Sequence, residues 1–204
     1  MKEMHMESCR FHNKSKFRIL DQLINCNTLF NIPQLFSFLA QDFIGSEYEV
    51  LEKGLSLIQS DKLAIRSSAA DEDGQINSAA GEYESVLNVS SDNLEKIIEA
   101  TNIVITSYEK KRQLLPEDEI MIQEMVENIS MSGVIFTHDL NTGAPYYVIN
   151  YDDQSGVTDT VTSGNSKYSN RTLYIHRDSI NKLHSEQFKK ILLAVQELEK
   201  VMNS

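Results

Sequence analysis

The residues best suited to chemistry lie in one stretch, where an arginine follows an apolar run and precedes small and hydroxylated residues. Arg66 comes after residues 63–65 and is followed by Ser67 and Ser68. The arginine offers a planar fork of N–H donors, the serines add hydroxyl donors, and Gly81 lets backbone N–H groups approach a ligand closely. These residue types predict a site for phosphate oxygens. The alternative is an arginine at a strand end that neutralises the acidic residues after it, Asp71, Glu72 and Asp73.

The order of residues around this stretch resembles a known family. The first block reads R-S-S-A at 66–69, E-D at 72–73, A-G-E-Y-E-S at 80–85 and L-N-V at 87–89. The second block reads I-Q-E-M-V at 122–126 and S-G-V-I-F-T-H-D at 132–139. Both resemble the N-terminal nucleotide-binding domain shared by phosphoenolpyruvate synthase, pyruvate phosphate dikinase and rifampin phosphotransferase. The resemblance covers about residues 15–200 and implies an α+β fold, an ATP-grasp-like domain of two lobes.

The resemblance assigns roles to single residues. Arg66 is implied to be the catalytic, phosphate-binding arginine. Gln123 is implied to lie beside the adenine, with a solvent-facing strand residue as the alternative. Lys16 stands where the family has a phosphate-binding lysine after two glycines, which this chain lacks, so Lys14 or a plain surface lysine remains the alternative. Residues 124–126 would read the base edge through their backbone. The implied ATP-binding set is Lys16, Arg66, Ser67, Gly81, Ser85, Gln123, Glu124 and Val126.

The family also implies cofactors and partners. They are ATP, Mg²⁺ and, in full-length relatives, a small-molecule acceptor that receives phosphate through a histidine on a separate domain; a homodimer would form through other domains. No metal ligand is assigned here, because the family's magnesium-binding carboxylate would follow residue 204, so the chain is expected to be C-terminally incomplete and inactive alone. Residues 144–150, and Leu140 in place of a proline, resemble a branch that phosphorylates L-glutamine. The alternative is a non-catalytic remnant that senses nucleotides or binds a partner.

Composition limits the other functions. The chain has 204 residues, with 19 lysines and arginines against 30 aspartates and glutamates, so its formal net charge is −11. This balance disfavours nucleic acid and anionic membranes, which attract basic patches. A hydrophobic fraction of 41% predicts a globular core. The two cysteines, Cys9 and Cys26, and the lack of a long apolar run predict a reduced, cytoplasmic protein that does not span a membrane.

Periodicity predicts the elements that position these residues. Helices are expected from Ser15, over 46–58 with a capping box of Ser46 and Glu49, over 92–109 with Asp92 as N-cap, and from Ser185. Strands are expected over 62–67, 82–89, 119–126, 131–137, 145–151 and 172–175. The predicted division is a flexible N-terminus (1–14), an N-terminal lobe with the phosphate-binding Arg66 loop (15–118), and a partial second lobe ending before the metal-binding strand (119–204).

Overall fold

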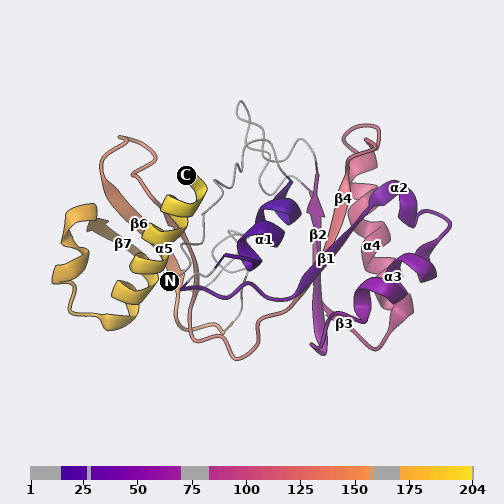
Figure 1. The fold of residues 1–204 in the computed structure, drawn as a ribbon, viewed down its shortest axis with the longest axis horizontal. Helices are drawn as coiled ribbons and strands as arrows, with labels where there is room; N and C mark the ends of the chain where they lie inside the picture. The colour runs from indigo at the N-terminus through magenta and orange to yellow at the C-terminus, as the bar shows by residue number, and fades with distance from the viewer. Residues whose placement is uncertain (1–14, 27–28, 70–82, 157, 159–170, 204) are drawn as a thin grey trace, which may run out of the picture. The chain divides into compact units, whose positions relative to one another are not determined.

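The chain folds into two compact units. The computed structural model describes residues 15–26, 29–69, 83–156, 158 and 171–203, drawn as a coloured ribbon in Figure 1. Unit 1 holds the described residues of 15–26 and 31–125, and unit 2 holds Leu29, Phe30 and the described residues from Val126 onward. The sequence placed the boundary after residue 118. The units instead divide after Met125, because the strand over 119–124 is paired on both sides within unit 1.

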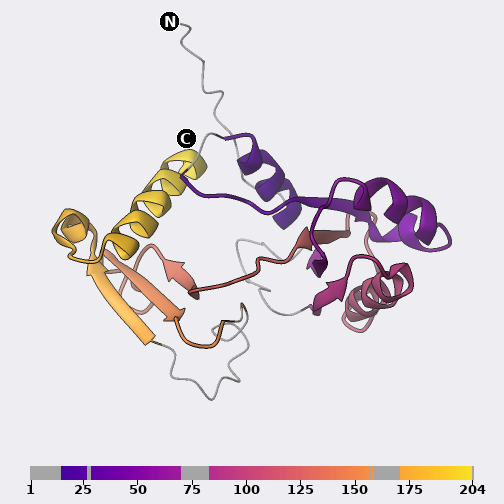
Figure 2. The ribbon, with the colours of Figure 1, turned by 90° about the horizontal axis from the view of Figure 1, so that it is seen from below.

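Unit 1 is built on a four-stranded antiparallel sheet. Its strands are β1 (Leu35–Leu39), β2 (Lys62–Ser68), β3 (Ser85–Ser90) and β4 (Glu119–Glu124), in the order β1-β4-β2-β3. Its helices are α1 (Lys16–Ile24), α2 (Ala40–Phe43), α3 (Glu47–Leu55) and α4 (Leu94–Glu109). Figure 1 shows α2, α3 and α4 on one side of the sheet and α1 on the other, and Figure 2 gives a second view of this arrangement.

The buried core of unit 1 lies between the sheet and the helices α2–α4. Ile65 of β2 and Ile122 of β4 pair with each other and are fully buried in one apolar cluster with α4. β3 reaches this cluster through a β-bulge. Val86 and Val89 are three residues apart, yet both contact the core, because the register shifts between them and Asn88 adopts a left-handed φ of 59°.

Helix α1 is anchored to the start of β4. Ser15 is its N-cap and accepts a hydrogen bond from the Arg18 N–H. The Ser15 hydroxyl also donates to the carboxylate of Glu119, and the Arg18 guanidinium pairs with the same carboxylate at 3.2 Å. Glu119 is only 4% exposed, so these two contacts satisfy a charge that water scarcely reaches.

The predicted caps of α3 and α4 are wrong in detail. Asn93, not Asp92, caps α4 by accepting from the Lys96 N–H. Ser46 is the N-cap residue of α3, but its side chain makes no cap bond, so the predicted capping box with Glu49 does not form. Its ψ of 29° departs from the extended backbone that lets a cap hydroxyl reach the first turn.

Unit 2 is a three-stranded antiparallel sheet with a long helix packed on it. The strands are β5 (Ser132–Phe136), β6 (Tyr146–Asp152) and β7 (Arg171–His176), in the order β5-β6-β7, followed by η1 (Arg177–Lys182) and α5 (Glu186–Asn203). Leu192 of α5 is fully buried with Tyr147 and Ile175. Gly133 must be glycine, because a Cβ there would lie 2.4 Å from the Asn150 carbonyl oxygen. Among helices of the described ranges, none is long and apolar enough to cross a bilayer.

The turn after β5 is closed by Asp139. Its carboxylate accepts from the Thr142 hydroxyl and from the N–H groups of Thr142 and Asn141, at 2.9, 2.8 and 3.0 Å. These bonds, the one from the Thr142 hydroxyl first, lower the pKa of Asp139. The carboxylate therefore fixes the turn in which Leu140 lies.

An ion pair and a tyrosine hydroxyl fasten α5 to η1 and to strand β6 of unit 2. Arg177 donates to both carboxylate oxygens of Glu199 at 2.8 Å, and the Tyr147 hydroxyl donates to the same carboxylate at 2.8 Å. The Arg177 guanidinium lies over the Tyr147 ring, 4.6 Å from its centroid. Burial alone would raise the pKa of Glu199, but the hydrogen bonds from Arg177 and Tyr147 outweigh it and hold that pKa below its ordinary value.

We predict that Glu199→Gln makes unit 2 less sensitive to acid. The folded-state pKa of Glu199 is below its ordinary value of 4.5, so its charge stabilises the fold above that value, and this stability is lost as the pH falls through the folded pKa. The free energy of unfolding is measured by urea titration at neutral pH and at about pH 3. Between these pH values it should fall by about 1 kcal/mol more in the wild type than in the variant.

The control for this measurement is Glu186→Gln. Glu186 lies on the same helix, its side chain is 74% exposed, and it pairs with Lys189 at 4.0 Å. This variant should follow the wild type at both pH values, because exposed ion pairs contribute little to stability. Equal acid responses in the wild type and in Glu199→Gln would show that the Glu199 contacts do not stabilise the fold.

Candidate functional site

One face of the unit 1 sheet brings together three of the predicted ATP-binding residues. Arg66 of β2 pairs with Ser85 of β3 and with Met121 of β4, and Gln123 follows two residues later on β4. Directly paired residues share a face of a sheet, and side chains alternate along each strand. Arg66, Ser85 and Gln123 therefore lie on the face opposite the α4 core.

Arg66 is a half-buried cation without a counter-ion in the described part of the chain. Its Nε is buried without a hydrogen-bond partner, and burial lowers the pKa of its guanidinium. A desolvated guanidinium with unused donors is suited to an anionic ligand. The predicted alternative, neutralisation of residues 71–73, falls outside the described residues. The other described arginines each pair with a carboxylate, as Arg18–Glu119, Arg112–Asp118, Arg171–Asp153 and Arg177–Glu199.

The two serines after Arg66 lie on different faces. Ser67 pairs with Ile120 and is buried on the α4 side, so its placement does not favour the predicted contact of its side chain with ATP. Ser68 lies on the Arg66 face, where its hydroxyl accepts a 3.0 Å hydrogen bond from the Phe17 N–H. Gly81, also in the predicted set, lies outside the described residues.

The end of β4 is held by hydrogen bonds to the neighbouring chain segments. Glu124 donates its N–H to the Gln34 carbonyl at 2.9 Å, and its carboxylate accepts from the N–H groups of Gln34 and Gln59 at 3.2 and 3.1 Å. The Met125 N–H donates to β2. The N–H groups of two of the three residues whose backbone was expected to read a base are thus used within unit 1. The role of Val126, which is exposed and belongs to unit 2, stays a prediction.

Lys16 lies at the first position of α1, close to the end of β2. Its neighbour Phe17 donates the backbone hydrogen bond to Ser68, and Ser68 is two residues beyond Arg66 on the same strand face. The contact therefore brings Lys16 toward the end of the sheet that carries Arg66. Lys14, the alternative phosphate lysine, lies outside the described residues.

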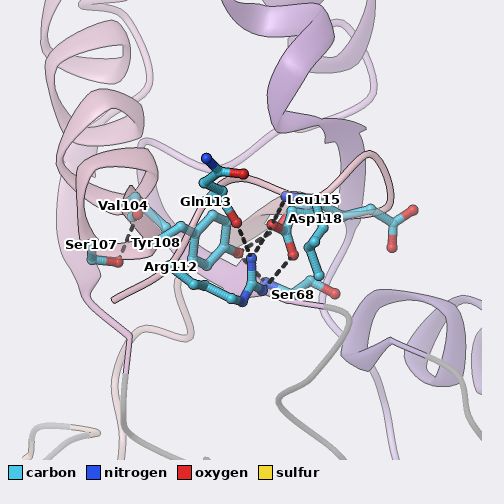
Figure 3. Close-up of polar contacts among 9 residues, drawn as sticks. Ser68, Val104, Ser107, Tyr108, Arg112, Gln113, Leu115 and Asp118 are labelled. Carbon is cyan, nitrogen blue, oxygen red and sulfur yellow. Dashed lines mark hydrogen bonds and ion pairs between the residues drawn. The ribbon is translucent and has the colours of Figure 1, made fainter. Parts of the chain in front are cut away.

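The last turns of α4 hold the strand ends that flank Arg66 and Ser85. The Tyr108 hydroxyl accepts from the Ser68 N–H at 2.9 Å and donates to the Glu119 carbonyl at 2.8 Å (Figure 3). The Ser107 hydroxyl accepts from the Glu84 N–H, just before β3, at 3.2 Å. The sequence pattern showed Tyr108 only as part of an apolar helix face. Its hydroxyl could have indicated this role, because a tyrosine that is expected to be fully buried needs a hydrogen-bond partner for that group.

A buried ion pair supports Tyr108. Arg112 donates to both carboxylate oxygens of Asp118 at 2.7 and 2.8 Å, and the Leu115 N–H adds a third bond of 2.7 Å to that carboxylate (Figure 3). The guanidinium lies 5.9 and 5.7 Å from the ring centroids of Tyr108 and Tyr83. The two rings meet edge to face at 4.8 Å. Since Tyr83 comes just before β3, this network ties that end of the strand to the end of β2.

Comparison with known families identifies the class of this domain. Residues 39–202 match the family described as pyruvate phosphate dikinase, AMP/ATP-binding domain. The chain belongs to this family. The match includes Arg66, Ser85 and Gln123, whereas Lys16 precedes it, and it confirms the expected α+β nucleotide-binding fold. A search of the curated proteins found no match.

The described residues of this AMP/ATP-binding domain contain no cluster of three or more histidines, cysteines, aspartates or glutamates that could hold a metal ion. A groove of about 570 Å³ runs along α4 and is lined by residues such as Ile98, Glu99 and Ile103. Arg66 is not among its lining residues, and α4 covers the opposite face of the sheet. This groove therefore does not mark the face of the sheet that carries Arg66.

We predict that Tyr108→Phe destabilises unit 1. The ring is kept, but the Ser68 N–H and the Glu119 carbonyl lose their shared partner. Unsatisfied buried polar groups cost about 1–3 kcal/mol, so the unfolding free energy from urea titration should fall by about 2 kcal/mol. The matched control is Tyr48→Phe on α3, where the side chain is 62% exposed. A shift of similar size in both variants, or no shift in Tyr108→Phe, would contradict the bridging role.

Proposed function

We propose that this AMP/ATP-binding domain binds ATP with the phosphates against the Arg66 face of the unit 1 sheet. The proposal rests on one observation: Arg66 is desolvated and has no carboxylate partner in the described ranges. Ser85 stands opposite it in the ladder and adds a hydroxyl donor. An anion that accepts from both side chains would restore the hydrogen bonds that burial removed from the guanidinium.

We propose separate tasks for the residues of this face. Arg66 would orient and neutralise phosphate oxygens, which is the main contribution of a protein to phosphoryl transfer. Gln123 pairs with Ala64, farther back along β2, so its amide lies toward the other end of the face. That amide carries both a donor and an acceptor, as recognition of an adenine edge requires. Mg²⁺, when bound, would offset phosphate charge and be coordinated mainly through the phosphates.

We further propose that the bound ATP serves a phosphotransferase reaction. In the full-length protein the phosphoryl group would pass to a histidine on another domain and then to a small-molecule acceptor, with L-glutamine as the candidate; cytoplasmic location fits the two-cysteine composition. The support is the sequence resemblance described above. The test is ATP consumption by the full-length protein with L-glutamine or D-glutamine. Equal rates would exclude glutamine, and binding without turnover would favour a nucleotide-sensing role.

We predict that Arg66→Ala selectively removes affinity for the phosphates. Hydrogen bonds to charged groups contribute about 1.5–3 kcal/mol, so affinity for a non-hydrolysable ATP analogue should fall about 10- to 150-fold, while affinity for adenosine changes little. Gln123→Ala should instead lower the affinities for the ATP analogue and for adenosine by the same factor. Titration calorimetry with the two ligands in the presence of Mg²⁺ measures both effects.

The matched control is Lys96→Ala, which removes an exposed positive charge from α4, on the opposite side of the sheet. It should bind the ATP analogue as the wild type does, which separates a local contact of Arg66 from the effect of net charge. If Arg66→Ala bound the analogue as tightly as Lys96→Ala, the phosphates would not lie at Arg66 and the proposal would fail.

A further inference from the structure

We propose that Ser68 is a positioning residue that couples Lys16 on α1 to Arg66 on β2, so that both cations act on the same phosphate chain. The inference rests on the proposed function, because it concerns the same face of the sheet. It assigns Ser68 no contact with ATP. The role of Ser68 is to hold together two segments that are 51 residues apart in sequence, joined by the Phe17–Ser68 hydrogen bond.

Ser68 is held from both sides of the sheet. It is fully buried, and its N–H donates to the Tyr108 hydroxyl of α4 at 2.9 Å. Its hydroxyl accepts from the Phe17 N–H of α1 at 3.0 Å. One residue therefore joins the core-side helix, the central strand and the helix on the opposite face. Its position cannot shift without moving the start of α1 as well.

The same contact brings the two cations near each other along the backbone. Arg66 is two residues before Ser68 on the same face, a separation of about 7 Å at the usual rise of a strand. Lys16 adjoins Phe17, with Cα atoms about 3.8 Å apart. Both side chains are long and cationic. Lysine and arginine therefore start from neighbouring points at one end of the sheet, as joint recognition of a phosphate chain requires.

Helix α1 needs such an anchor. It has nine residues, too few for an isolated helix to be stable in water, so tertiary contacts must decide where it lies. The bonds of Ser15 and Arg18 to Glu119 hold its first turn to β4. The bond from Phe17 to Ser68 holds the same turn to β2, the strand that carries Arg66. Of these three contacts, only the last ties Lys16 directly to the phosphate-binding strand.

The test is a double-mutant cycle on affinity for a non-hydrolysable ATP analogue with Mg²⁺. In the wild-type background, Lys16→Ala should weaken binding about tenfold, as expected for loss of a charged hydrogen bond. In the Ser68→Ala background it should weaken binding by no more than about twofold, because Lys16 is no longer held at the site. Ser68→Cys, which keeps the shape but offers only a weak acceptor, should give the same result if Ser68→Ala folds poorly.

The matched control background is Ser107→Ala. Ser107 is also buried, and its hydroxyl also accepts from a backbone N–H, that of Glu84, but it lies on α4 and not at the α1 contact. Lys16→Ala should keep its tenfold effect there. A reduced effect in the Ser107→Ala background as well would mean that general loosening of unit 1, and not the Ser68 contact, controls Lys16, and would overturn the inference.

The outcomes separate this inference from the proposed function. Suppose that Arg66→Ala lowers the affinity for the analogue. If Lys16→Ala then has no effect in the wild type, or keeps its tenfold effect in the Ser68→Ala background, only the coupling by Ser68 is wrong. If Arg66→Ala leaves affinity for the analogue unchanged, the phosphate site itself is misplaced, whatever the cycle shows.

Discussion

The hydroxyl of Tyr108 joins the last paired residues of the two central strands of unit 1. Ser68 ends β2, Glu119 begins β4, and the hydroxyl accepts from the N–H of the first and donates to the carbonyl of the second. Buried backbone groups must be paired, so these strands can end inside the protein only because α4 supplies a polar atom there. Arg66 and Ser68 keep their places on the opposite face because this end of the sheet is fixed.

Both units place an arginine–carboxylate ion pair next to a buried tyrosine. In unit 1 Arg112 pairs with Asp118 near Tyr108, and in unit 2 Arg177 pairs with Glu199 over Tyr147. In each case the carboxylate accepts two hydrogen bonds from the guanidinium, and an aromatic ring lies close to it. These contacts offset most of the free energy that burying the charge costs. Arg66 is half-buried but has no carboxylate partner among the residues that the structure describes. This contrast separates an arginine that stabilises the fold from one that is available to a ligand.

Local patterns allowed most elements to be predicted, and failed where the outcome depends on backbone angles or on partners. The apolar spacing along 92–109 and the alternation along 62–67 correspond to α4 and β2. The cap of α4 shifted by one residue, and the capping box of α3 did not form, because a cap depends on the ψ of a single residue. The boundary moved beyond β4 because pairing with both β1 and β2, which no local pattern contains, assigns that strand to unit 1.

The sequence by itself determined the family, the α+β class and the residue types of the candidate site, because ordered motifs and periodicity are properties of neighbouring residues. The tertiary structure decided which of those residues share a face. Strand register put Arg66, Ser85 and Gln123 together, turned Ser67 toward the core, and gave Ser68 a bond to α1. Register and burial arise from contacts between segments far apart in the chain. Only the tertiary structure could therefore show that Arg66 is half-buried and has no counter-ion within the described ranges.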